Sequence, residues 1–521
     1  MTDTPFPAGG TAVVEPAAPR HGRLAQRALG LPSVLFCIVT GAAPMAAMLF
    51  NVPVAVQGGG YSVPSAFFIA TVALTIFSVG YIAMARRVTS AGGFYTFISR
   101  GLGRIAGVGS GLLIGLCYVF FVCATTGVTG YFAATTVEAW TGIALPAWLY
   151  MVVALAAMSL LAWLHIELTA KVLGVALVAE VLAMVVLSVA VFAHGGAEGL
   201  SPAPLNPAEV FGNAGAIKVF GVAGSGIALF AAFWSWVGFE MAPNYAEESR
   251  DPHRIARIAT YASVIGLGVF YMFVSYAYVT GWGLESSVKA VYDQFHGVYA
   301  SAFYPLSDRY VGSPLTAVIQ LLAVTSSFAC AMAFYNTASR YLFALGREHV
   351  LPPVLARTSR RHSPAVASMT VTGIAALYGL GFVLYDPSTE GALLKLGTWS
   401  PLLGVLGILA VQALVCVAIV RYFLTTARDG FRWFGTLVAP ILGGAAMVGA
   451  CWLLVANRDT LAGAEGVPFI TFLPWVIVTI FVVGVVIAAV MRTRRPDRYA
   501  DLGHFSLADP ELDATPDSRL H

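Results

Sequence analysis

Charged residues are scarce in this chain of 521 residues, of which Asp, Glu, Lys and Arg make up 11%. Soluble globular domains carry about 25%. Hydrophobic residues make up 58%, and the mean hydropathy is +0.79. A net charge of +3 gives no nucleic-acid-binding signal. The composition therefore excludes an ordinary soluble domain and indicates an integral membrane protein.

The chain also lacks the usual marks of catalysis. Its six cysteines lie within apolar runs and its nine histidines are scattered, and neither set has the spacing of metal ligands. We interpret the cysteines as small packing residues. There is no GxxxxGK[ST] loop for a nucleotide. We therefore predict no enzyme activity, no cofactor and no metal, and expect a proton or sodium gradient to drive any transport.

Twelve long apolar runs occupy most of the chain. Each is long enough to cross a hydrocarbon core of about 30 Å as a helix, and backbone polar groups in lipid need partners within the segment. Barrel strands would alternate with period two, and these runs do not. The predicted helices cover 33–56, 64–84, 105–134, 146–164, 168–193, 218–249, 258–281, 311–346, 363–385, 392–424, 433–456 and 469–491.

The basic residues predict the orientation. With a cytoplasmic N-terminus, all but five of the 29 Lys and Arg residues fall in inside segments, which agrees with the positive-inside rule. Both termini are then cytoplasmic, and the number of spans is even. We expect a disordered cytoplasmic tail over 1–30, without the apolar core of a signal peptide, and a second cytoplasmic tail over 492–521. The exceptions are Lys218, Lys289, Arg309, Lys395 and Arg458.

Two predicted helices are interrupted near their middle. The first contains "TGAAP" (40–44), and the sixth contains "SWVGFE" (235–240) followed by Pro243. Glycine tolerates irregular backbone, and proline suits the first turn of a new helix. Breaks at matching places in two halves are typical of the binding site of a transporter.

The order of the predicted helices indicates two related halves. Residues 31–195 form a first set of five helices, 196–428 a second set, and 429–491 two more. An amphipathic connection precedes the third helix of each set, on opposite sides of the membrane. We therefore predict an all-α integral membrane protein with a five-plus-five inverted repeat, in which helices 1 and 6 are broken.

Three stretches resemble motifs of bacterial amino acid permeases, which belong to the amino acid–polyamine–organocation superfamily. They are "RRVTSAGGFYTFISRGLG", "FWSWVGFEMAPNYAEESRDP" and "ASRYLFALGREHVLPPVLARTSRRHSP". The resemblance covers about 32–428. It implies a leucine-transporter-like fold of twelve helices, in agreement with the number of apolar runs.

The two breaks predict a substrate site. A broken helix exposes free N–H groups at one new end and free C=O groups at the other, with partial charges of about half a unit. Such ends suit the carboxylate and ammonium groups of an amino acid. We expect backbone contacts from Thr40, Gly41, Ala42, Ala43, Ser235 and Gly238, and side-chain walls from Phe233, Trp234, Trp236 and Phe334. The resemblance implies that Trp234 lies against the substrate.

Two carboxylates lie within predicted helices, where an ionisable residue indicates a functional role. Glu240 can carry a proton, or it can cap the N–H groups of the second half of helix 6. Glu180 stands where many related permeases have a lysine. It can bind a proton, or it can hold sodium together with helix 1 and with Thr325, Ser326 or Ser327.

The sequence thus predicts a secondary active transporter in the cytoplasmic membrane. A neutral, fairly bulky amino acid with proton symport is favoured. The alternatives are a polyamine or a cationic amino acid, sodium coupling and exchange. A channel would need filter loops or a polar stripe. The expected partners are a small-molecule substrate and the lipid bilayer, with no nucleic acid and no obligate protein.

Overall fold

The computed structural model describes residues 30–88, 92–164, 166–212, 214–220, 224–241, 251–359, 363–386, 388–461 and 467–503. Every extended regular element within these ranges is a helix. The all-α class predicted from the apolar runs is therefore confirmed for the described part of the chain. The predicted N-terminal tail lies outside it, apart from Gly30.

The first half of the chain contains a broken helix followed by four long helices and one short helix, α5. In order, the elements are α1 (Leu31–Ala42), α2 (Pro44–Ala46), the π-helix η1 (Ala47–Asn51), α3 (Val52–Gly59), α4 (Val63–Ala85), α5 (Gly93–Leu102), α6 (Arg104–Thr141), α7 (Ala147–Leu164) and α8 (Ile166–Ala193).

The second half adds short helices between the long ones. These elements are α9 (Pro207–Gly212), α10 (Ala216–Phe220), α11 (Ser225–Trp234), α12 (Pro252–Trp282), α13 (Leu284–Phe295), α14 (Phe303–Tyr310), α15 (Ser313–Arg347), α16 (Ala365–Tyr385), α17 (Thr389–Thr425), the π-helix η7 (Trp433–Val438), α18 (Ala439–Ala456), α19 (Arg458–Leu461), α20 (Pro468–Arg494) and α21 (Pro496–Asp501).

Nine helical segments of the described chain are long and apolar enough to cross a membrane. One of them, Val34–Ala85, covers the second predicted run and all of the first except residue 33. Two shorter apolar helices, Ala147–Trp163 and Gly226–Met241, lie within the fourth and sixth predicted runs, 146–164 and 218–249. The chain is therefore a multi-pass membrane protein, while twelve crossings and an inverted repeat stay predictions.

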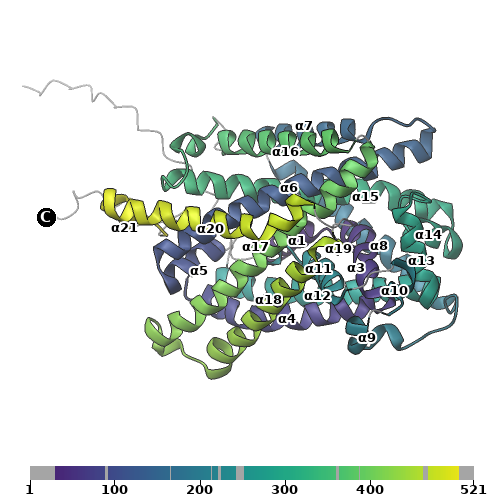
Figure 1. Cartoon of the computed structure of the whole chain (residues 1–521), viewed down its shortest axis with the longest axis horizontal. Helices are drawn as coiled ribbons and strands as arrows, with labels where there is room; N and C mark the ends of the chain where they lie inside the picture. The colour runs from purple at the N-terminus through teal and green to yellow at the C-terminus, as the bar shows by residue number, and fades with distance from the viewer. Residues whose placement is uncertain are drawn as a thin grey trace, which may run out of the picture.

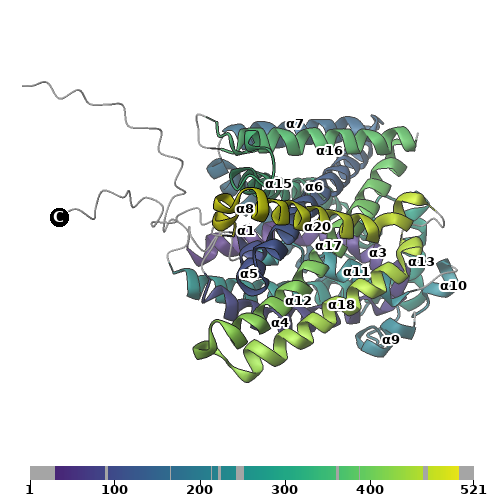
Figure 2. The same ribbon diagram turned by 60° about the vertical axis from the view of Figure 1, so that its left-hand side comes forward.

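The long helices form one bundle with short helices at its two ends. In Figure 1, α9, α10, α13 and α14 lie at one end of the bundle, and α5 and α21 lie at the other. The helices α7 and α16 pack side by side along one edge in both views (Figures 1 and 2). Both amphipathic connections predicted from the sequence are helical, as α5 and as α13 with α14.

The broken helices occupy the interior of this bundle. The α1 helix contacts α12 and α15, and α11 contacts α3, α4 and α18. Their central residues are buried: Met45, Ala231 and Trp236 have no exposed surface. The breaks therefore lie inside protein, where irregular backbone can find hydrogen-bond partners within a membrane.

The predicted C-terminal tail begins with ordered structure. The α20 helix extends to Arg494, and α21 follows it. The side chain of Leu502 is 1% exposed and packs among residues of α5, α6, α15 and α20. Tyr95 donates a hydrogen bond to Glu348, and the N–H of Gly503 donates to the Tyr95 hydroxyl at 3.0 Å. Residues 496–503 are thus fixed to the end of the bundle.

Candidate functional site

The break in the first helix centres on Ala43. This residue adopts the left-handed conformation with φ 42° and ψ 72°, and its N–H donates to the carbonyls of Val39 and Thr40. A left-handed alanine costs about 1–2 kcal/mol, so the surrounding contacts must hold it in place. Pro44 then opens α2 in a position where its missing N–H has no effect. The predicted interruption at "TGAAP" is present.

The break after α11 centres on Gly238. The helix ends at Trp234, a turn covers 235–238, and a single 3₁₀ turn leads to Met241. Gly238 has φ 115°, a conformation that side-chain-bearing residues rarely adopt. The first half of the predicted helix 6 and its interruption are present. The second half, which includes 242–249, lies outside the described residues.

The two breaks touch each other. A Cβ atom on Gly238 would lie 3.3 Å from the carbonyl carbon of Gly41. The hydroxyl of Tyr271, on α12, donates to the carbonyl of Ser235 at 2.8 Å and faces that of Ala42 at 3.4 Å. One hydroxyl thereby joins the carbonyl ends of both broken helices, so their backbones form a single packed unit.

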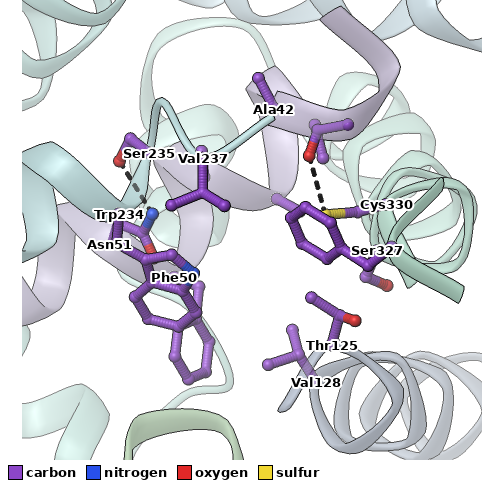
Figure 3. A pocket seen from close by; sticks show the side chains of 15 residues that line it. Ala42, Phe50, Asn51, Thr125, Val128, Trp234, Ser235, Val237, Ser327 and Cys330 are labelled. Atoms are coloured by element: carbon purple, nitrogen blue, oxygen red, sulfur yellow. Dashed lines mark hydrogen bonds between the residues drawn. The ribbon is translucent and has the colours of Figure 1, made fainter. Parts of the chain in front are cut away.

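A cavity lies beside this junction. Figure 3 shows the side chains that converge on it from the first broken helix, α6, α11 and α15. The volume open to the centre of a water molecule is about 40 Å³, and one buried water needs about 10–15 Å³ by that measure. The lining residues are Gly41, Ala42, Ala43, Ala46, Ala47, Phe50, Asn51, Thr125, Val128, Trp234, Ser235, Val237, Ser327, Cys330 and Phe334.

Six of the ten predicted substrate contacts line this cavity: Gly41, Ala42, Ala43, Trp234, Ser235 and Phe334. The indole of Trp234 packs edge-on against Phe50, with ring centroids 5.7 Å apart. Ser327, predicted as an ion ligand, lines it as well.

The other four predicted contacts lie elsewhere. Phe233 and Trp236 line a smaller, separate cavity with Gln412 of α17. The indole N–H of Trp236 donates to the carbonyl of Val264, so its ring packs against α12. Thr40 is buried outside the cavity lining, and Gly238 contacts the backbone of Gly41 instead.

Several lining residues were missed by the sequence analysis, and Asn51 is the most polar of them. It ends the π-helix η1, where the wider turn alters which side chains face the cavity. Its Nδ2 atom donates to the Ser235 hydroxyl at 2.8 Å, across the two broken helices. A lone amide within an apolar run was a usable signal. Thr125, Val128 and Cys330 gave none, because only tertiary packing brings α6 and α15 to this place.

Glu180 connects α8 to the start of the second half of helix 1. Its side chain is 2% exposed, and its carboxylate accepts from the Ser326 hydroxyl at 2.6 Å and from the N–H of Met45. The same hydroxyl accepts from the N–H of Ala46 at 3.2 Å. The carboxylate therefore satisfies, directly and through Ser326, the two N–H groups that follow Pro44.

Glu240 likewise accepts a hydrogen bond from a backbone N–H group at the second break. Its carboxylate accepts from the N–H of Gly238 at 3.0 Å and from the hydroxyl of Tyr118, on α6, at 2.7 Å. Its carbonyl accepts from Tyr81 of α4 at 2.7 Å. A carboxylate thus accepts from backbone N–H groups at each break. For Glu180, at the start of α2, this is favourable because helix N-termini carry partial positive charge.

The remaining predicted ion ligands bond within their own helix. The hydroxyl of Thr325 donates to the carbonyl of Leu322 at 3.1 Å, and that of Ser327 donates to Ala323 at 2.8 Å. In the described residues, no group of three or more His, Cys, Asp or Glu side chains is arranged to hold a metal ion.

Comparison with known proteins agrees with this architecture. The chain is 24% identical over 416 residues to the low-affinity putrescine importer PlaP of Escherichia coli K12, which covers 77% of this chain and 82% of that protein. It is 27% identical over 356 residues to the gamma-aminobutyric acid permease of the same organism, covering 67% and 72%.

A third relative matches over a shorter stretch. The D-serine/D-alanine/glycine transporter of E. coli K12 is 32% identical over 184 residues, which is 35% of this chain and about a third of the length of that relative, 36%. All three relatives are named as transporters of amino acids or amines. The family model described as "Amino acid permease" matches residues 29–493, and the chain therefore belongs to the amino acid permease family.

Proposed function

We propose that this protein is a secondary active transporter that moves a small amino acid or amine across the cytoplasmic membrane by alternating access. The observation that carries the proposal is the junction of two broken helices beside a buried cavity. Irregular backbone at Ala43 and Gly238 leaves the first halves of both helices free to change direction without breaking a continuous ladder of hydrogen bonds. The positive-inside pattern supports cytoplasmic termini.

The size and lining of the cavity support a small substrate. About 40 Å³ for water centres is room for a few waters, so a fairly bulky amino acid, as favoured from the aromatic residues, fits poorly without further opening. No charged side chain lines the cavity, which favours a neutral amino acid among zwitterions. A small amine is the second candidate, because a carboxylate already caps the N–H groups at each break.

We propose proton coupling through Glu180. Ionised, its carboxylate holds the N–H groups at the start of the second half of helix 1. Protonation removes the charge that the helix N-terminus attracts, an effect of about 0.3–2 kcal/mol, and so loosens this segment from α8. Sodium coupling is less well supported, because the Ser326 hydroxyl, one of the predicted sodium ligands, already accepts from the N–H of Ala46 and donates to Glu180.

The test is uptake into proteoliposomes with imposed proton or sodium gradients, screened over the common amino acids and putrescine. We expect accumulation driven by the proton gradient and abolished by an uncoupler. A Glu180→Gln variant should still exchange substrate but lose accumulation. Gradient-driven accumulation that survives in that variant would contradict the coupling role.

The indole of Trp234 provides a test of the cavity itself. Trp234→Ala removes a ring that contacts both the cavity and Phe50, and we expect a weaker apparent affinity for substrate. Trp452, which is 68% exposed on α18, is the matched control, and its replacement by alanine should leave uptake kinetics unchanged. Unchanged kinetics in Trp234→Ala would exclude this cavity as the substrate site.

A further inference from the structure

The N–H groups that could bind a substrate carboxylate are already occupied in the described part of both breaks. Glu180 and Ser326 take those of Met45 and Ala46, and the carboxylate of Glu240 takes that of Gly238. The N–H of Ala43 bonds back into α1, and that of Met241 bonds to the Gly238 carbonyl. A zwitterion would have to displace one of the glutamates in order to place its carboxylate at a helix start.

The hydroxyl groups of the cavity also direct their protons away from it. Thr125 donates to the carbonyl of Phe121 at 2.7 Å, Ser235 to Ala231 at 2.8 Å, and Ser327 to Ala323 at 2.8 Å. A hydroxyl that donates to its own helix retains lone pairs for a further donor. These three oxygen atoms are therefore presented to the cavity as hydrogen-bond acceptors.

Asn51 adds a fourth acceptor, and its orientation follows from the same bonds. Since Ser235 gives its proton to Ala231, its oxygen must accept from Asn51, so the Nδ2 atom of Asn51 faces Ser235 at 2.8 Å. The Oδ1 atom then points away from Ser235 and has no hydrogen-bond partner among the described residues. An amide oxygen free in a cavity suits an N–H donor.

Aromatic rings complete the surroundings. Phe50, Trp234 and Phe334 all line the cavity, and the faces of such rings attract cations, with the interaction strengthened when the site is desolvated. A substrate with many N–H donors and a positive charge matches the acceptors and the aromatic rings that line the cavity. A carboxylate matches none of them.

We propose that the cavity selects small amines through their ammonium group and disfavours their carboxylated counterparts. This inference rests on the proposed function, and it selects the small amine over the neutral amino acid as the substrate class of the same site. Thr125, Ser327 and Asn51 are its specificity-determining residues, because their oxygen atoms supply acceptors from α6, α15 and the first broken helix.

Matched pairs of compounds test the inference. Ethanolamine and serine differ by one carboxylate, and so do putrescine and ornithine. Binding to the purified full chain is measured by isothermal calorimetry. We expect the amine of at least one pair to bind ten-fold or more tightly than its carboxylated counterpart. Equal binding within both pairs, tighter binding of serine and ornithine, or no binding of any of the four would overturn the inference.

Two variants at one position separate acceptor chemistry from packing. Thr125→Val keeps the shape of the side chain and removes its oxygen, and we expect the affinity for the bound amine to fall about ten-fold, as for the loss of a hydrogen bond to a charged group. Thr125→Ser keeps the oxygen and should remain within about two-fold. Equal affinities in two variants that melt like the parent would overturn the acceptor role.

Transport assays distinguish failure of the inference from failure of the proposed function. If serine or ornithine accumulates along an imposed gradient and the amines do not, the proposed transport function is supported and the amine preference is contradicted. If amines bind with the expected preference but no compound is accumulated or exchanged, the amine selectivity of the cavity is supported and the proposed transport function is contradicted.

Discussion

At the scale of single residues, Gly238 shows how tightly the junction is built. Its φ of 115° is unfavourable for any side-chain-bearing residue, and its missing Cβ leaves room for the backbone of Gly41. Any other residue at this position would therefore have both an unfavourable backbone conformation and a Cβ atom close to the Gly41 backbone. The approach of two main chains, more than any side chain, sets the geometry of the breaks.

We therefore expect Gly238→Ala to lower the free energy of unfolding by about 1–3 kcal/mol and to abolish substrate uptake. The measurement is a thermal unfolding curve in detergent together with uptake into proteoliposomes. Gly266→Ala on α12 is the matched control, because a Cβ there meets no atom within 4 Å. A helical glycine in open space should gain about 0.5–1 kcal/mol on this change. Normal uptake by Gly238→Ala would show that the close approach is not needed for function.

Cavity residues that lie within or beside a recognisable sequence motif could be predicted from the sequence. Gly41, Ser235 and Trp234 lie within motifs that mark a break, and they line the cavity. Trp236 and Phe233 are their neighbours in sequence, but Trp236 bonds to Val264 of α12 and Phe233 lines the separate cavity with Gln412 of α17. Cys330 reaches the carbonyl of Gly41 across 289 residues of chain, and no local pattern reports such a distant neighbour.

At the scale of helices, the apolar runs located the elements within a few residues. The run 105–134 corresponds to α6, which extends to Thr141, and the run 363–385 corresponds to α16. The hydrophobic run ends where the sequence becomes more polar, but α6 continues beyond it through Thr135 and Thr136 to the exposed residues 138–141. The π-helix η1 could not be predicted, since its cause is the packing of the break and not its composition.

The connection between α16 and α17 is held by charge. Asp386 pairs with Lys395 at 2.6 Å and accepts from the N–H and hydroxyl of Ser388. The hydrogen bonds from Lys395 and Ser388 lower the pKa of Asp386 from 3.8 to about 2. Because the folded pKa is depressed, this stabilisation is present above pH 3.8 and is lost as the pH falls toward 2.

We expect Asp386→Asn to lower the free energy of unfolding at pH 7 by about 1 kcal/mol. The difference from the parent should shrink as the pH falls from about 4 to 2, and thermal midpoints in detergent measure it. Glu285→Gln is the control, because the Lys218–Glu285 pair has both side chains 74% exposed and should contribute little. A difference that stays constant from pH 7 to pH 2 would contradict the ionic explanation.

At the scale of the whole molecule, the segment that follows α20 packs back against one end of the helix bundle. Residues 496–503 lie against α5, α6 and α15, with Leu502 buried and its carbonyl accepting from Arg104 at 3.0 Å. Gly503 fits close to Ser99, where a Cβ would lie 2.8 Å from that side chain. The sequence predicted a tail here, since a six-residue helix with one buried leucine carries too weak a pattern to be recognised.

Leu502→Asp should release this segment without unfolding the bundle. We expect faster hydrogen exchange over 495–503 and new tryptic cleavage at Arg498, with a thermal midpoint close to that of the parent. Asp497→Ala, at an exposed position of α21, should show neither change. Unaltered exchange in Leu502→Asp would mean that Leu502 does not hold the segment.

The π-helix η1 has a consequence for the lining of the cavity. A π-turn accommodates one residue more than an α-turn, and Asn51 is the last residue of this stretch. Deleting one residue from 47–50 would replace the π-turn by regular α-helical winding and leave the segments before and after it in nearly the same relative orientation. Gly41 would then still meet Gly238, while the side chains of 47–51 that face the cavity would change, so the extra residue determines the lining of the cavity and not the junction of the breaks.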